Sequence, residues 1–130
     1  MSKQIMLVDD EVVMLALLGM TMKRGGFAVI EAENAVMALD LLEKSTPDLV
    51  VLDLMMPGID GVELCRRIRA RQQTADTPIL MLSALNDAES IKRALAAGAN
   101  DFLSKLTPHR EVLAKVHTLV GEASKPGKVS

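Results

Sequence analysis

The chain has 130 residues, of which 49% are hydrophobic and 25% are charged, and its formal net charge is −2. This length and composition fit one globular domain with its own core and argue against an intrinsically disordered chain. The charge offers no basic face for direct nucleic-acid binding, and a chain with two phenylalanines and no Trp or Tyr is poorly equipped to stack bases or a flavin ring.

The start of the chain has no signal-peptide pattern, because acidic residues follow an apolar run of only four residues. The longest near-apolar stretch, residues 12–20, is about half as long as a membrane span, so we expect no membrane insertion. Cys65 is the single cysteine, which rules out an intrachain disulfide and favours a cytoplasmic location.

Five short apolar runs without alternation predict strands that are covered on both faces. They are residues 5–8, 27–31, 49–52, 78–82 and 101–103. Helical patterns separate them, and the alternation of five strands with helices predicts an α/β fold, a doubly wound (βα)5 parallel sheet with helices on both faces. We assign residues 1–121 to this domain and residues 122–130, which are polar and contain Gly, Pro and Ser, to a tail or the start of a linker.

Capping residues mark where the helices begin. Asn34 precedes a helix over residues 35–44, and Asp60 with Gly61 opens one over residues 62–71. A capping box from Asn86 to Glu89 opens a helix that stops at residue 98. Thr107 and the proline after it open a last helix that ends near residue 120.

Three acidic residues follow predicted strands. Asp9 and Asp10 come after the first strand, and Asp53 comes after the third. In a doubly wound sheet the functional crevice lies at the carboxyl ends of the strands, so these carboxylates converge if the two strands are neighbours. Such a cluster calls for a cation, and its all-oxygen donor set suits Mg²⁺, or Mn²⁺, better than zinc.

Two further strand ends add a hydroxyl at Ser83 and an ammonium at Lys105. Together with a cation, they would form a receptor for a tetrahedral dianion attached to Asp53, as in phosphoryl transfer. Each group also has a structural interpretation. Asp10 can favour a helix start, Asp53 can cap a turn, Ser83 is uninformative and Lys105 can be solvated, so the functional hypothesis depends on their joint occurrence.

The chain resembles the response-regulator receiver domains of bacterial two-component signalling and chemotaxis, from about residue 3 to residue 120. The motifs that carry the resemblance are IMLVDDE (5–11), VVLDLMMPGIDG (50–61), ILMLSA (79–84) and GANDFLSK (98–105). The resemblance implies a flavodoxin-like sheet with strand order 2-1-3-4-5. It also implies a phosphorylation switch, not an enzyme in the usual sense, that hands its signal to a downstream effector protein or domain.

The resemblance also implies residue roles. Asp53 would accept a phosphoryl group from a histidine kinase or a histidine phosphotransfer protein. Mg²⁺ would be held by Asp10 and Asp53 directly, by Asp9 through water and by the backbone carbonyl of Met55. Ser83 and Lys105 would bind phosphoryl oxygens, and the small side chain of Ala84 would leave access. Phe102 would be the switch aromatic that reports on the site, with an ordinary core ring as the alternative.

Two features depart from the family pattern. The family usually has a proline after the lysine, often with a cis peptide, whereas Leu106 follows Lys105 here. A cis bond at this position would cost about 3–4 kcal/mol. The sequence leaves two alternatives open: a strained cis turn, or a trans turn in which Lys105 approaches the site along a different path from the one usual in the family. The first helix is apolar almost all round, so Met14 and Leu18 on its outer side are expected to form a partner or homodimer surface, unless that side is covered.

Three other functions remain open. A Mg²⁺-dependent phosphatase with an aspartyl nucleophile lacks its usual second aspartate, because Met55 occupies that position. A flavodoxin-like cofactor carrier lacks a phosphate loop and stacking aromatics. A degenerate receiver would bind partners without phosphorylation. Because neither Met55 nor Leu85 can activate a water, we expect slow loss of the phosphoryl group from Asp53.

Overall fold

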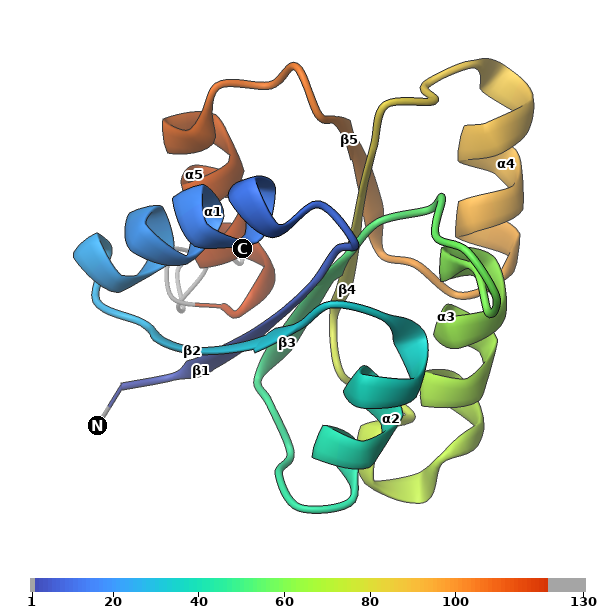
Figure 1. The fold of residues 1–130 in the computed structure, drawn as a ribbon, viewed down its shortest axis with the longest axis horizontal. Coiled ribbons are helices and arrows are strands. Elements are labelled where there is room, and N and C mark those ends of the chain that lie inside the picture. The colour runs from blue at the N-terminus through green and yellow to red at the C-terminus, as the bar shows by residue number, and fades with distance from the viewer. Residues whose placement is uncertain (1, 122–130) are drawn as a thin grey trace.

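The apolar runs form a five-stranded parallel sheet in a computed structural model that describes residues 2–121 (Figure 1). The strand order β2-β1-β3-β4-β5 confirms the predicted doubly wound topology. Each predicted strand is present with its ends moved by at most one residue. The strands are β1 (Gln4–Val8), β2 (Ala28–Ala32), β3 (Leu49–Leu52), β4 (Ile79–Ser83) and β5 (Asp101–Ser104).

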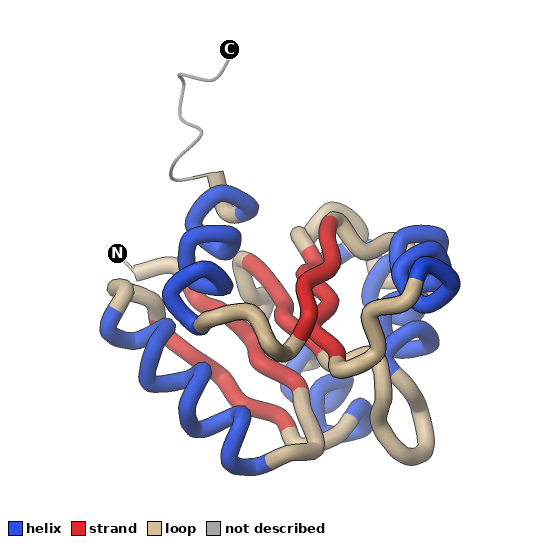
Figure 2. Tube along the Cα trace, turned by 90° about the horizontal axis from the view of Figure 1, so that it is seen from above, coloured by secondary structure: helices blue, strands red, loops and turns tan. Residues whose placement is uncertain are grey.

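Helices cover both faces of the sheet. The helices α1 and α5 lie on one face and α2, α3 and α4 on the other (Figures 1 and 2). Each face has its own cluster of buried apolar residues, and the central strands β3 and β4 are buried throughout. The helices are α1 (Val12–Arg24), α2 (Ala35–Leu42), α3 (Gly61–Ala70), α4 (Ala88–Ala96) and α5 (His109–Leu119), with a 3-10 turn at Gln72–Thr74.

Two helix starts differ from the predicted caps. The cap of α4 is Asp87 and not Asn86, because the Asp87 carboxylate accepts hydrogen bonds from the Ser90 backbone N–H (3.2 Å) and hydroxyl (2.7 Å). At α5, Thr107 provides no side-chain cap. The helix begins after Pro108, whose carbonyl accepts from two backbone N–H groups of the first turn.

The predicted caps at Asn34 and Asp60 are confirmed. The Asn34 side chain accepts from the Met37 backbone N–H at 2.8 Å, and the Asp60 side chain accepts from that of Glu63 at 2.9 Å. The bounds of these helices differ slightly from the predicted ones. The helix α2 ends at Leu42 instead of residue 44, and α3 covers Gly61–Ala70 instead of residues 62–71.

The outer side of α1 is exposed, but not at both residues that the sequence suggested. Leu18 is 2% exposed and belongs to the core beneath α1 and α5, so its assignment to an outer surface was wrong. Met14 is partly buried against the same core. The exposed large apolar side chains of this helix are those of Val12, Val13, Leu17 and Met20. No helix within residues 2–121 combines the length and apolar character needed to cross a bilayer.

Candidate functional site

The sheet brings the predicted site residues to one edge, at the carboxyl ends of its strands. Backbone hydrogen bonds continue the pairing of the strands by one residue: Asp9 N–H donates to the Ala32 carbonyl (3.1 Å) and Asp53 N–H to that of Val8 (3.0 Å). These bonds fix the backbone of both aspartates on neighbouring strands, as the functional interpretation of the sequence requires. A chain whose first and third strands were apart would have separated them.

The three carboxylates form one cluster. Each of Asp9, Asp10 and Asp53 offers an oxygen within 4.8 Å of the others, with Asp9 and Asp53 buried and Asp10 exposed. The Asp9 carboxylate accepts from the Glu11 N–H (2.9 Å) and that of Asp53 from the Met55 N–H (3.2 Å), which orients both groups. An all-oxygen set of this kind fits a hard divalent cation such as Mg²⁺.

The environment of Asp53 opposes its negative charge. Burial raises the pKa of the Asp53 carboxyl above its ordinary value of 3.8, and the negative charge of Asp9 adds to this increase. The hydrogen bond from Met55 and the ammonium of Lys105 lower the pKa, but they do not cancel the effect of burial. Asp53 is therefore a desolvated carboxylate that gains from a nearby cation.

The Lys105 ammonium reaches this cluster. Its Nζ lies 3.1 Å from Asp53 Oδ2, 2.9 Å from Asp9 Oδ2 and 2.8 Å from Glu11 Oε1, and the side chain is only 10% exposed. Burial by itself lowers the pKa of the ammonium, but the hydrogen bonds to Glu11 and Asp9 and the charge of Asp53 outweigh it and raise the pKa above 10.5. Lys105 therefore stays charged at the site.

The turn after Lys105 runs trans, since the described residues contain no cis peptide bond. The Lys105 N–H donates to the Ser83 carbonyl at 2.9 Å, which extends the pairing of β4 with β5. The Ser104 hydroxyl accepts from the Leu106 N–H at 3.0 Å, and the Leu106 side chain points into solvent at 90% exposure. This local hydrogen bonding brings the lysine to the acids without a proline.

A hollow of about 240 Å³ opens above the acids. Its walls include Asp53, Ala84 and Lys105, so a small group attached to Asp53 would lie beside the ammonium. The remaining lining residues are Asp10, Glu11 and Met55. Ser83 is fully buried at the end of β4 and does not line the hollow; its hydroxyl accepts from the Leu85 N–H at 3.2 Å.

Phe102 lies in the middle of β5, opposite Met81 in the strand register. Its ring is half-buried and packs against the apolar cluster under α2, α3 and α4. The ring is therefore neither a fully enclosed core residue nor a solvent-exposed one, which is compatible with both interpretations of the sequence.

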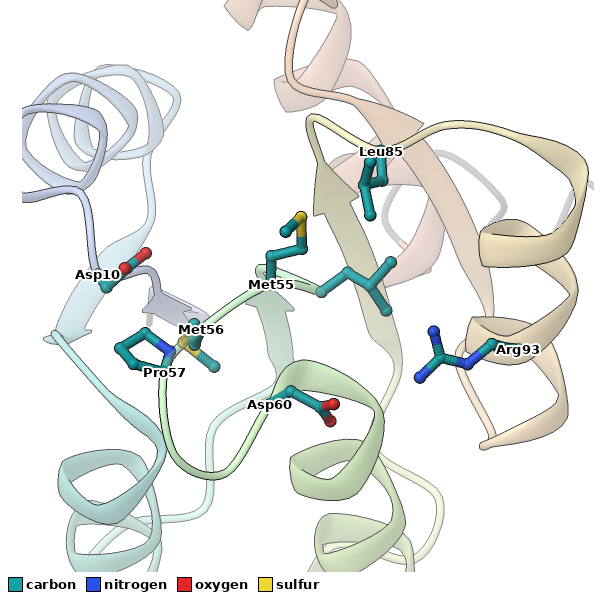
Figure 3. A pocket seen from close by; sticks show the side chains of 8 residues that line it. Asp10, Met55, Met56, Pro57, Asp60, Leu85 and Arg93 are labelled. Atoms are coloured by element: carbon teal, nitrogen blue, oxygen red, sulfur yellow. The ribbon is translucent and has the colours of Figure 1, made fainter.

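A larger pocket of about 510 Å³ adjoins the site between the loop after β3 and α4 (Figure 3). Met55 and Leu85 lie on its side nearest β4, and both are exposed. Asp60, the residue before α3, and Arg93 on α4 point toward the pocket. The other lining residues are Asp10, Leu54, Met56 and Pro57.

Sequence reasoning missed one member of the site, Glu11. The sequence assigned its carboxylate no role at the site, whereas it makes the shortest contact of Lys105, at 2.8 Å. The signal was its position: Glu11 is a third acid directly after β1, at the same sheet edge as the lysine that follows β5.

The chain is similar to known proteins over nearly its whole length. The family model described as "Response regulator receiver domain" matches residues 5–117. The alkaline phosphatase synthesis transcriptional regulatory protein PhoP of Bacillus subtilis is 40% identical over 120 residues, which are 92% of this chain and 49% of the relative. The phosphate regulon transcriptional regulatory protein PhoB of Pseudomonas aeruginosa is 34% identical over 118 residues, 91% of this chain and 52% of the relative.

Solved structures agree in fold. A putative response regulator from Chloroflexus aurantiacus has a TM-score of 0.89 at 32% identity, covering 93% of this chain and 99% of that one. The chemotaxis protein CheY4 of Vibrio cholerae has a TM-score of 0.88 at 26% identity, covering 92% and 99%. This chain spans about half the length of the curated relatives that it matches. It belongs to the family of response-regulator receiver domains, which are signalling domains of two-component systems.

Proposed function

We propose that Asp53 is the phosphoryl acceptor of this receiver domain. The observation that carries the proposal is the contact set of its carboxylate, which is buried beside Asp9 and lies 3.1 Å from the Lys105 ammonium, at a hollow open to solvent. A nucleophile in this position meets an incoming phosphoryl group where positive charge is already present.

Asp10 and Asp53 are the proposed direct ligands of Mg²⁺, with Asp9 acting through water and Met55 through its backbone carbonyl. The support is the convergence of the three carboxylates and the absence of nitrogen and sulfur donors among them. When bound, Mg²⁺ neutralises negative charge on the carboxylates and on the phosphoryl oxygens. The remaining chemistry belongs to the residues of the chain.

In the proposed reaction, a carboxylate oxygen of Asp53 attacks the phosphorus of the donor. A new O–P bond forms, and the bond from phosphorus to the donor atom breaks, with its electron pair leaving on the donor. The Lys105 ammonium holds a phosphoryl oxygen in the hollow, which the small side chain of Ala84 keeps open. Ser83 contributes its hydroxyl by giving up its bond to the Leu85 N–H, and Phe102 moves in response.

Response regulators take phosphoryl groups from histidine kinases and act on downstream effectors. For this chain we propose a phosphohistidine on a kinase or phosphotransfer protein as the donor, and the α4-β5-α5 face as the output to an effector protein or domain. Residues 1–121 form the proposed receiver domain; residues 122–130 lie outside the described residues. The proposed location is the cytoplasm, where a single buried thiol at Cys65 needs no partner. A homodimer through the exposed side of α1 is a further proposed partner.

A small phosphodonor tests this function. Incubation with acetyl phosphate and Mg²⁺ should add one group of about 80 Da to the intact protein, without release of many equivalents of phosphate. Repeated turnover would point instead to the phosphatase. A folded protein that takes up no phosphoryl group would be a degenerate receiver that acts without phosphorylation.

A further inference from the structure

The Lys105 ammonium has three hydrogen-bond donors, and three carboxylates lie within reach of them. Two of these partners, Asp9 and Asp53, belong to the cluster that could hold a metal ion. Glu11 is the remaining partner and lies outside that cluster. Binding of a cation or phosphorylation of Asp53 would therefore affect the contacts of Asp9 and Asp53 with Lys105 differently from the contact of Glu11.

Asp9 and Asp53 acquire other partners when the site works. A bound cation would compete for their oxygens, and a phosphoryl group bonded to an oxygen of Asp53 would remove the carboxylate charge that Lys105 now contacts. Glu11 lies outside the metal cluster and would gain neither of these partners. Its contact with Lys105 is therefore the one of the three that neither a cation in the cluster nor a phosphoryl group on Asp53 would replace directly.

The backbone around Glu11 directs its side chain toward the lysine. The Glu11 N–H donates to the Asp9 carboxylate (2.9 Å), and its carbonyl accepts from the Leu15 N–H (3.1 Å), so the residue is tied on both sides. Glu11 occupies the cap position of α1 in extended conformation, yet its side chain makes no cap hydrogen bond. The carboxylate is turned to the Lys105 Nζ at 2.8 Å instead.

We infer that Glu11 is a positioning residue that holds the Lys105 ammonium over Asp53. The Lys105 backbone is fixed by its bond to Ser83, but the long side chain beyond it has several rotatable bonds. Glu11 restricts these bonds from the solvent side of the hollow, which it also helps to line. The inference rests on the proposed function and adds a residue to its machinery.

The expected effect is moderate, because the Glu11 side chain is 62% exposed and solvent screens its charge. Glu11→Gln keeps an oxygen that can accept from the ammonium, whereas Glu11→Ala removes the contact altogether. We expect phosphorylation by acetyl phosphate to slow about fivefold in Glu11→Ala and by less in Glu11→Gln. A matched control is Glu43→Ala, which removes an acid paired with Arg71 at the end of α2.

Two measurements on the 130-residue chain test the inference. The first is the NMR signal of the Lys105 side-chain ammonium, which hydrogen bonding protects from exchange with water. We expect the strongest signal in the wild type and in Glu43→Ala, a weaker one in Glu11→Gln, and the weakest in Glu11→Ala, where only the contacts with Asp9 and Asp53 remain. An unchanged signal in Glu11→Ala would overturn the inference.

The second measurement is a double-mutant cycle on the phosphorylation rate. If Glu11 acts through Lys105, Glu11→Ala slows the wild type but has no further effect on Lys105→Met. Equal slowing in both backgrounds would show a role that is independent of the lysine and would overturn the inference. A wild type that takes up no phosphoryl group would refute the proposed function, while the NMR signal would still decide whether Glu11 holds Lys105.

Discussion

Asp53 is a buried carboxylate whose folded-state pKa lies above its ordinary value of 3.8 because of its burial and the neighbouring charge of Asp9. The folded protein therefore binds the Asp53 proton more tightly than the unfolded chain does. It follows that the contribution of Asp53 to the free energy of unfolding falls as pH rises from about 3.8 through the raised pKa. At neutral pH, without a cation, this residue destabilises the fold.

We predict that Asp53→Asn raises the free energy of unfolding at pH 7.5, because an amide carries no charge to desolvate. The gain should shrink at pH 4, where the wild-type carboxyl is closer to its protonated form. Urea unfolding of both proteins in EDTA at the two pH values measures the difference. A gain that is as large at pH 4 as at pH 7.5 would contradict the assigned cause.

The residues beside Asp53 determine how long a phosphoryl group would persist. Met55 lines the hollow, and both Met55 and Leu85 line the adjoining pocket with side chains that cannot orient a water. We therefore predict a phosphoryl lifetime of minutes or more after removal of acetyl phosphate, followed by intact mass. Met55→Asn, which places an amide in the hollow, should shorten this lifetime. A wild-type half-life of seconds would disprove the prediction.

Asp9, Asp10 and Asp53 could be predicted from sequence because they follow strands, and the end of a strand is a feature of local sequence. The conformation of the turn that follows Lys105, and the contact of Lys105 with Glu11, could not. The trans turn is supported by the Ser104 hydroxyl, and the contact joins residues 94 positions apart along the chain. Ser104 directly precedes the lysine, but a serine at this position does not by itself indicate a trans turn, and Glu11 is remote in the sequence.

At the scale of elements, the link between β3 and α3 requires a glycine. Gly61 is the first residue of α3, and a Cβ there would clash with the backbone carbonyl of Asp53 and lie 2.7 Å from Leu54 Cα. The loop thus folds back onto the residue that carries the proposed acceptor, and the Gly61 N–H donates to the Leu54 carbonyl at 2.9 Å.

We predict that Gly61→Ala lowers the free energy of unfolding by about 2 kcal/mol, since backbone and not a flexible side chain must move. It should also slow phosphorylation, because the displaced backbone is that of Asp53. The control is Gly58→Ala in the same loop: Gly58 has a φ of +77° but open space around its Cα. Its backbone conformation should cost about 1 kcal/mol without slowing phosphorylation.

Chemical denaturation and the acetyl phosphate reaction measure the two effects. Equal phosphorylation rates in Gly61→Ala and the wild type would show that the loop and Asp53 are not mechanically connected.

The residue that caps a helix with its side chain was predicted correctly for α2 and α3. Asn34 and Asp60 stand alone as candidates, and both cap their helices. Before α4, Asn86 and Asp87 compete, and the outcome depends on Ser90, whose hydroxyl adds a second bond to Asp87. The burial of Leu18 was equally hidden from sequence, because a helix with apolar residues all round does not indicate which side meets the sheet.

For the whole molecule, the alternation of strands with helices predicted a doubly wound parallel sheet, and the resemblance to receiver domains supplied the strand order that decides which strand ends meet. One consequence is that three carboxylates from two strands lie together near one lysine. The fold therefore contains a cluster of negative charge that a divalent cation would relieve.

We predict that Mg²⁺ raises the free energy of unfolding by about 2.7 kcal/mol at 100 times its dissociation constant, because it binds the folded chain alone. Thermal unfolding with and without MgCl₂ at matched ionic strength measures the change. Asp10→Asn should reduce the stabilisation sharply, whereas Asp40→Asn, on α2 and outside the cluster, should retain it. Equal stabilisation of all three proteins would show that the cation binds elsewhere.

If Asp53 accepts the phosphoryl group, chemical mapping must find the modification at position 53. After reaction with acetyl phosphate and Mg²⁺, the acyl phosphate is reduced with borohydride, which converts the modified aspartate to homoserine, and the peptides are sequenced by mass spectrometry. We expect homoserine at position 53 in the wild type and no modification in Asp53→Asn. Modification of Asp9 or Asp10 in the wild type, with position 53 unchanged, would contradict this assignment of the acceptor.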